Sequence, residues 1–336
     1  MRRENAVENF YNSRKPGWAI HSIGVALVTI IIFVVLFSKI DLSHTISVLT
    51  QIDPKFLIIA IILSIVSNII IPTEEWRCIL KALGCKISYK DALLMKLGNA
   101  PIKNITPFKS GEMIRVFCLK KMCNVPFSLG MLSVFMSVVF GLFAICLIAF
   151  FGCIVFAKNP YGIGYMSFLS VVLITFLHIL FRKDREGMIL CSLKRWSEKL
   201  YGALKSFKEL YVSVQIWKLV LPFLYVVIVK VSEVLVFFVI FKGLGAQLPI
   251  SSLFIFVPIV MIVSFVPIAI LGLGVREGVI LMLFNGDASG EILLSGGILF
   301  SVIDYVLPAV IGLFFTRGLL AKVLAKNASE DPSKEA

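Results

Sequence analysis

The sequence predicts an all-α fold, a polytopic integral membrane bundle of about six full spans plus two re-entrant broken-helix hairpins arranged as an inverted repeat. Three observations predict it. Of the 336 residues, 59% are hydrophobic and only 16% are charged, which leaves too little polar surface for an exterior facing water. Long apolar runs alternate with segments that Gly and Pro interrupt. The Lys and Arg residues gather in some of the loops and avoid the others.

Six apolar runs are expected to cross the bilayer, because a helix needs roughly 20 apolar residues to cross a hydrocarbon core. They are residues 19–37, 56–71, 129–156, 166–181, 220–241 and 292–315. The second and fourth of these lie near the lower length limit. The first run follows several basic residues, as in a signal peptide. It is too long for that and no cleavage site follows, so we expect an uncleaved first helix.

The positions of the basic residues predict the topology. Segment 73–127 carries ten Lys and Arg residues and segment 182–218 carries nine, whereas the loops at 39–55, 158–164 and 285–291 carry two, one and none. The positive-inside rule places the two basic segments in the cytoplasm. We therefore expect a multi-pass protein of the inner (plasma) membrane with both termini cytoplasmic. Topology also explains the positive charge, so no nucleic-acid partner is expected.

Two apolar segments, at about 92–116 and 253–284, do not read as simple spans. The residues that interrupt them include Pro107, Gly111, Pro267, Gly272 and Gly274. Each segment begins and ends on the same predicted side of the membrane, the first on the cytoplasmic side and the second on the external side. The second segment is too short for two full spans. Re-entrant hairpins from opposite faces are typical of inverted-repeat transporters, and broken backbone at membrane depth predicts a polar site. Two kinked helices with no site between them are the alternative.

The remaining segments are read from composition. Residues 1–322 form one transmembrane domain, and 323–336 form a polar tail. Within the domain, residues at about 186–212 have the pattern of a basic amphipathic helix. Such a helix lies on the anionic inner leaflet or packs on other cytoplasmic loops. The seven cysteines show no metal-ligand spacing, and we expect no metal and no cofactor.

Each broken segment offers one carboxylate and one guanidinium. Glu112 and Arg115 are one helical turn apart after the first break, and Arg276 and Glu277 follow the second. A charge at membrane depth costs at least ~2.5 kcal/mol, so such groups persist mainly when they are paired or used. Arg binds phosphate bidentately, and a helix N-terminus favours an anion, so a phosphate headgroup would suit these residues. The alternative is that Glu112 and Arg115 only neutralise each other.

A third pair lies inside an otherwise apolar run. Lys230 and Glu233 are three residues apart within 220–241 and are expected to face the interior of the bundle. Substrate binding and a purely structural salt bridge are both open for this pair. Asp304, a lone acid in the last apolar run, is expected to face the cavity or a partner such as Lys230.

The run 104–115 and the later run 272–278 resemble the transmembrane-region family of lysylphosphatidylglycerol synthases. This family supplies the flippase-like module of multiple peptide resistance factors and also occurs as stand-alone proteins. The resemblance covers residues 18–322 and implies a helical membrane fold that moves a lipid or lipid-linked substrate across the bilayer. It implies a site at Pro107, Gly111, Glu112, Arg115, Gly272, Gly274, Arg276 and Glu277.

This sequence departs from the family pattern in two ways. Four apolar residues, 268–271, stand between Pro267 and Gly272, where a more compact turn rich in Pro and Gly is expected. The chain also stops without a soluble aminoacyl-transfer domain, so we do not expect it to make lysyl-lipid.

The expected function is transbilayer movement of an anionic phospholipid or a lipid-linked substrate. The alternatives are an integral-membrane lipid-modifying transferase and a scaffold for envelope-lipid biosynthesis. No catalytic or ATP-binding motif is visible, so we do not expect an enzyme or an ATP-driven pump. The expected partners are the lipid substrate, the anionic inner leaflet, and either a second copy of the chain or a lipid-synthesis enzyme.

Overall fold

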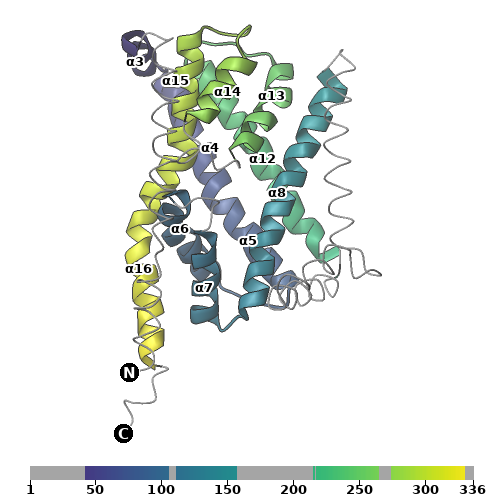
Figure 1. Ribbon diagram of the computed structural model, residues 1–336, viewed down its shortest axis with the longest axis vertical. Coiled ribbons are helices and arrows are strands. Elements are labelled where there is room, and N and C mark those ends of the chain that lie inside the picture. The colour runs from purple at the N-terminus through teal and green to yellow at the C-terminus, as the bar shows by residue number, and fades with distance from the viewer. Residues whose placement is uncertain (1–41, 106–110, 157–214, 216, 265–273, 330–336) are drawn as a thin grey trace, which may run out of the picture.

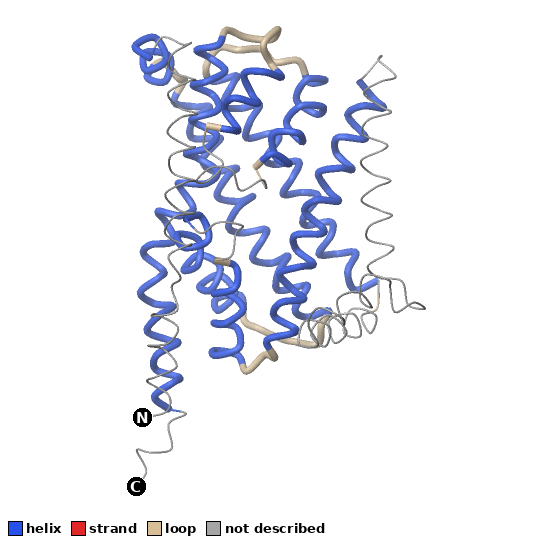
Figure 2. The backbone as a smooth tube through the Cα atoms, in the orientation of Figure 1, coloured by secondary structure: helices blue, strands red, loops and turns tan. Residues whose placement is uncertain are grey.

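The computed structural model describes residues 42–105, 111–156, 215, 217–264 and 274–329 (Figure 1). Within these residues every regular element is a helix, which confirms the all-α prediction (Figure 2). The elements are α3 (Leu42–Thr50), α4 (Pro54–Ile65), η1 (Val66–Ile70), α5 (Ile71–Ala82), α6 (Tyr89–Ile105), α7 (Glu112–Cys123), α8 (Phe127–Phe156), α12 (Trp217–Gly243), α13 (Ile250–Val263), α14 (Val275–Leu283), α15 (Gly290–Ser301), η4 (Val302–Val306) and α16 (Leu307–Ser329).

Four stretches of the described chain are long and apolar enough to cross a membrane. They are Pro54–Ala82, Phe127–Val155, Trp217–Gly243 and Gly290–Val323, and they coincide with four of the six predicted runs. The runs 19–37 and 166–181 lie outside the described residues, so the total of about six spans stays a prediction. The predicted helix at 186–212 also lies outside them. At the other end of the chain, α16 continues to Ser329, into the segment predicted as a polar tail.

Two pairs of short helices occupy the two predicted broken segments. In Figure 1, α6 and α7 lie in the lower half of the bundle and α13 and α14 lie in the upper half. Each pair stands in the chain between two of the long apolar stretches and is called a hairpin below. Gly274 begins α14 with a φ of 85°, a left-handed conformation that suits glycine, and this explains why the break falls there.

The packing places apolar side chains both inside the bundle and on its surface. The ring centre of Phe237 of α12 lies 5.4 Å from those of Phe284, the residue directly after α14, and Phe300 of α15. Exposed positions on the long helices are also large and apolar, such as Phe151 and Phe314. An apolar surface of this kind suits lipid contact.

Two of the long helices contain a π-helical turn, which holds one more residue than a regular turn. η1 lies between α4 and α5, and η4 lies between α15 and α16. The hydroxyl of Ser64 donates a hydrogen bond to the carbonyl of Ile303, at 2.9 Å, and joins the first helix to the second beside these turns. The two π turns therefore lie next to each other within the bundle.

The helices α6 and α16 approach each other very closely. A Cβ atom added to Gly312 would lie 2.4 Å from the carbonyl oxygen of Leu97, and the Thr316 hydroxyl donates to the Gly98 carbonyl at 3.1 Å. Near the helix ends, Lys322 pairs with Asp91 at 3.0 Å. The Ser88 hydroxyl and then this ammonium lower the pKa of Asp91.

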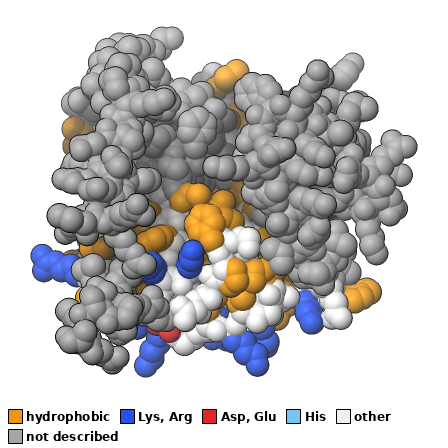
Figure 3. Space-filling model, turned by 60° about the horizontal axis from the view of Figure 1, so that its bottom comes forward, with side chains coloured by type: hydrophobic (Ala, Val, Ile, Leu, Met, Phe, Trp, Pro, Cys, Tyr) orange, Lys and Arg blue, Asp and Glu red, His pale blue; other side chains and the backbone are white. Residues whose placement is uncertain are grey.

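Basic side chains gather at the end of the bundle where α5 and α7 end (Figure 3). Lys81, Lys86, Lys90 and Lys120 are exposed there. These residues belong to the first of the two basic segments on which the topology prediction depends.

We expect Gly312→Ala to lower the free energy of unfolding by about 1–3 kcal/mol. The new methyl group would overlap the backbone carbonyl of Leu97, which cannot change rotamer as a side chain could. Thermal unfolding of the purified protein in detergent measures this. Gly141→Ala, within α8, is the matched control, since no atom of the described residues lies within 4 Å of its Cβ position. Equal stability of the two variants would contradict the close contact.

Candidate functional site

Many of the buried and partly buried polar residues form two groups. One surrounds the start of α7 and is called the α7 cluster: Glu75, Trp76, Lys96, Asn99, Lys103, Glu112, Arg115 and Ser137. The other joins the start of α14 to α12 and the two π turns and is called the π-turn cluster: Ser64, Asn68, Lys230, Glu233, Ser264, Arg276, Glu277, Ser301, Asp304 and Tyr305.

In the α7 cluster, Glu112 lies between two cations. Its Oε1 is 3.3 Å from the Lys103 ammonium, and its Oε2 is 3.2 Å from Nε of Arg115. The second contact is an ion pair by distance only. Neither Oε2 of Glu112 nor Nε of Arg115, both buried, has a hydrogen-bond partner among the described residues. The Arg115 guanidinium carbon lies 4.3 Å from the centre of the Trp76 ring. Glu112 and Arg115 therefore pair, but they do not satisfy each other fully.

Sequence reasoning identified only Glu112 and Arg115 as site residues in this cluster and missed its other six members. Glu75 is buried and accepts a hydrogen bond of 2.8 Å from Ser137 of α8. It lies within electrostatic range of Lys96 and Arg115. The Oδ1 atom of Asn99 is buried with no hydrogen-bond partner among the described residues. The position of Glu75 on the helix could have predicted its burial. Glu74 pairs with Arg77 on the more exposed face of α5, whereas Glu75 points inward.

At the start of α14, Arg276 and Glu277 are fully buried and joined through a serine. Arg276 donates from Nη1 to the Ser301 hydroxyl at 2.8 Å, and that hydroxyl donates to Oε1 of Glu277. Arg276 also donates from Nε to the Ser264 hydroxyl at 3.1 Å. The other oxygen of Glu277 accepts the backbone N–H of Gly274, which fixes the carboxylate at the helix N-terminus.

An aromatic ring fixes the plane of this guanidinium too. The guanidinium carbon of Arg276 lies 3.9 Å from the centre of the Tyr305 ring in η4. Stacking of this kind orients the planar group and directs its N–H donors sideways, the geometry in which Arg binds a phosphate or carboxylate. Arg115 on Trp76 and Arg276 on Tyr305 thus repeat one arrangement at the two hairpins.

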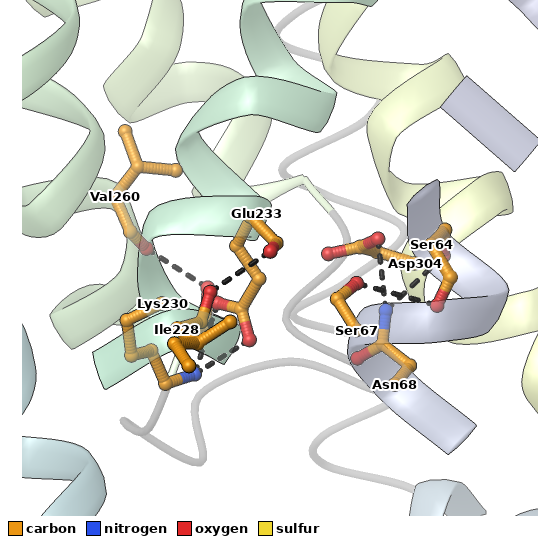
Figure 4. Close-up of polar contacts among 10 residues, drawn as sticks. Ser64, Ser67, Asn68, Ile228, Lys230, Glu233, Val260 and Asp304 are labelled. Atoms are coloured by element: carbon orange, nitrogen blue, oxygen red, sulfur yellow. Dashed lines mark hydrogen bonds and ion pairs between the residues drawn. The ribbon is translucent and has the colours of Figure 1, made fainter. Parts of the chain in front are cut away.

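Lys230 and Glu233 form a buried ion pair on α12, as predicted. The Lys230 ammonium lies 2.7 Å and 2.9 Å from the two oxygens of Glu233, and the two side chains are 16% and 8% exposed. Figure 4 shows this pair facing the residues of η1 and η4 across the interior.

Asp304 has a different partner from the one suggested by the sequence. Its Oδ1 accepts a hydrogen bond of 3.0 Å from the side-chain amide of Asn68, which lies in η1 (Figure 4). The same amide donates to the Ser64 hydroxyl at 3.1 Å. Lys230 is not bonded to Asp304 but lies within its electrostatic range, together with Glu233 and Arg276.

The structure thus brings some of the predicted residues together and separates others. Lys230 and Glu233 share the π-turn cluster with Arg276 and Glu277, whereas Glu112 and Arg115 belong to the α7 cluster. Gly111 and Gly274 directly precede α7 and α14. The predicted residues Pro107, Pro267 and Gly272 lie outside the described part of the chain. Within that part, no group of three or more His, Cys, Asp or Glu side chains could hold a metal ion.

Comparison with known proteins identifies relatives along most of the chain. A family model described as "Lysylphosphatidylglycerol synthase TM region" matches residues 22–312. A UPF0104 membrane protein of Methanocaldococcus jannaschii is 22% identical over 310 residues, which cover 85% of this chain and 91% of that protein.

We expect Lys230→Met to lower the free energy of unfolding by about 3–5 kcal/mol, because it leaves Glu233 buried without its cation. Chemical or thermal unfolding in detergent measures the change. The double variant Lys230→Met/Glu233→Leu should recover most of the loss, since neither charge remains. A single variant as stable as the wild type would place Lys230 in water.

Proposed function

The chain belongs to the lysylphosphatidylglycerol synthase transmembrane-region family, and from this premise we propose that it moves an anionic phospholipid or a lipid-linked anion across the membrane. The single observation that carries the proposal is the stacked, buried arginine near the start of the second helix of each hairpin. Arg115 and Arg276 are 4% and 0% exposed, and each has a carboxylate within three residues.

The energetic argument begins with the cost of these charges. A guanidinium at membrane depth costs at least ~2.5 kcal/mol on insertion scales, so packing alone does not explain two of them. A phosphate or phosphodiester offers the planar, bidentate partner that a guanidinium prefers. The neighbouring carboxylates, Glu112 and Glu277, neutralise the cations while no anion is bound. We therefore infer that the substrate is a lipid whose anionic headgroup binds at these residues while its acyl or prenyl chains stay in the bilayer.

The placement of the hairpins supports transport rather than static binding. The two hairpins lie in opposite halves of the bundle, and each is flanked in the chain by two long apolar helices (Figure 1). We propose that they are the two halves of an inverted repeat. In alternating access, Glu112 and Arg115 would meet one leaflet, and Arg276 and Glu277 the other. The exposed lysines beside α7 favour a cytoplasmic position for that end, with both termini there.

The test is lipid transfer in proteoliposomes made with fluorescent anionic and zwitterionic lipids. Arg276→Lys and Arg115→Lys keep the charge but remove the fork of donors, and Glu112→Gln removes the balancing carboxylate. We expect each variant to slow transfer of the anionic lipid by about 10- to 100-fold, because a hydrogen bond to a charged group is worth about 1.5–3 kcal/mol.

The matched control is Arg77→Lys, an arginine on the more exposed face of α5 that pairs with Glu74. This variant should transfer lipid at the wild-type rate. Equal rates for Arg276→Lys and the wild type would contradict the proposed site. Folded wild type that moves neither phospholipids nor polyprenyl phosphates would contradict the function and favour a scaffold.

A further inference from the structure

We propose that Asp304 is a proton-binding site, and that its protonation is coupled to binding of the anion at Arg276; the coupling rests on the proposed function, but proton binding does not. Asp304 lies in the π turn η4, is 6% exposed and faces the interior of the bundle. Neither the family match nor the sequence pattern assigns it this role.

Residues of five elements surround Asp304. Ser64 of α4 and Asn68 of η1 lie on one side (Figure 4). Lys230 and Glu233 of α12 lie on another, and Arg276 of α14 and Tyr305 of η4 are further ionisable neighbours. Glu277 joins this set through Ser301, which contacts both Glu277 and Arg276.

The charges of this cluster do not balance when every group is ionised. Within the described residues it holds three carboxylates, Glu233, Glu277 and Asp304, and two cations, Lys230 and Arg276, so three minus two leaves one negative charge. An uncompensated charge inside a low-dielectric bundle is costly, and such a group takes up a proton instead. One proton from water, bound to one carboxylate oxygen, makes the cluster neutral.

The hydrogen bonds show which carboxylate takes the proton. Glu233 has the Lys230 ammonium on both of its oxygens. Glu277 accepts a backbone N–H on one oxygen and the Ser301 hydroxyl on the other. Among the described residues, Asp304 is approached only by neutral hydrogen-bond donors, the side-chain amide of Asn68 at 3.0 Å and the hydroxyl of Ser64. The anionic form of Asp304 is therefore the least stabilised of the three.

The coupling between protonation of Asp304 and anion binding follows because Asp304 lies within electrostatic range of Arg276. Tyr305, next to Asp304 in the chain, stacks on the Arg276 guanidinium. An anion bound at Arg276 adds a negative charge beside Asp304 and Glu233 and so favours the protonated form of Asp304. By linkage, the proton strengthens anion binding by the same factor. The anion and the proton then move together, and the charge crossing the membrane is smaller by one unit than for the anion alone.

Difference infrared spectroscopy of the full-length protein in lipid, recorded across a pH titration, tests proton binding without any transport. The wild type should show the C=O stretch of a protonated carboxyl group that disappears as pH rises. Asp304→Asn should lose this band, and the control Asp287→Asn, in the loop between α14 and α15, should keep it. A wild type without the band, or a band unchanged in Asp304→Asn, would overturn the proposal.

A second variant keeps the test decisive if Asp304→Asn does not fold. Asn68→Leu removes the amide that stabilises the ionised carboxylate while preserving bulk. The midpoint of the band should move up by about one pH unit. A midpoint that stays in place would count against Asp304.

Lipid transfer tests the coupling separately. Acidifying the side from which the anionic lipid starts should accelerate transfer severalfold in the wild type and not in Asp304→Asn. Transfer that is independent of pH, with the band present, would refute the coupling and leave both the proton site and the transport function. A band without any lipid transfer would refute the proposed function and leave the proton site.

Discussion

The rest of the structure depends on the absence of water inside the bilayer, which obliges every polar group at that depth to find its partner within the protein. Helices meet this requirement for most of the backbone. At the π turns and at the starts of α7 and α14 the regular pattern is interrupted, and buried polar side chains gather close to these places. Asn68 and Asp304 lie within the two π turns, and Glu277 accepts the free N–H of Gly274.

Much of the fold could be predicted because the same requirement acts on composition. Long apolar runs predicted the four described spans, and Gly and Pro predicted the breaks after α6 and α13. The pairing of Lys230 with Glu233 could also be predicted, because the two opposite charges lie one turn apart in a helix whose neighbouring residues are uncharged. What these cases share is a signal within one segment of the chain.

The parts that could not be predicted depend on contacts between distant segments. The π turns left no sequence pattern, and Asn68 reads as an ordinary polar residue until η1 is placed beside η4. For the same reason the hydrogen-bond partner of Asp304 could not be predicted: Lys230 lies within electrostatic range, as expected, while Asn68 makes the hydrogen bond. Glu75 and Asn99 join the α7 cluster through the packing of α5 and α6, which periodicity alone did not reveal.

The close approach of α6 and α16 has a mechanical consequence. Where a glycine of one helix touches the backbone of another, no flexible side chain lies between them to absorb sliding, as at Gly312 against Leu97. The Thr316 hydrogen bond and the Lys322–Asp91 pair join the same two helices, so we expect α6 and α16 to move together. The first hairpin is thus fastened through α6 to the helix that continues from η4, so we expect a displacement of α6 to displace the turn that holds Asp304 as well.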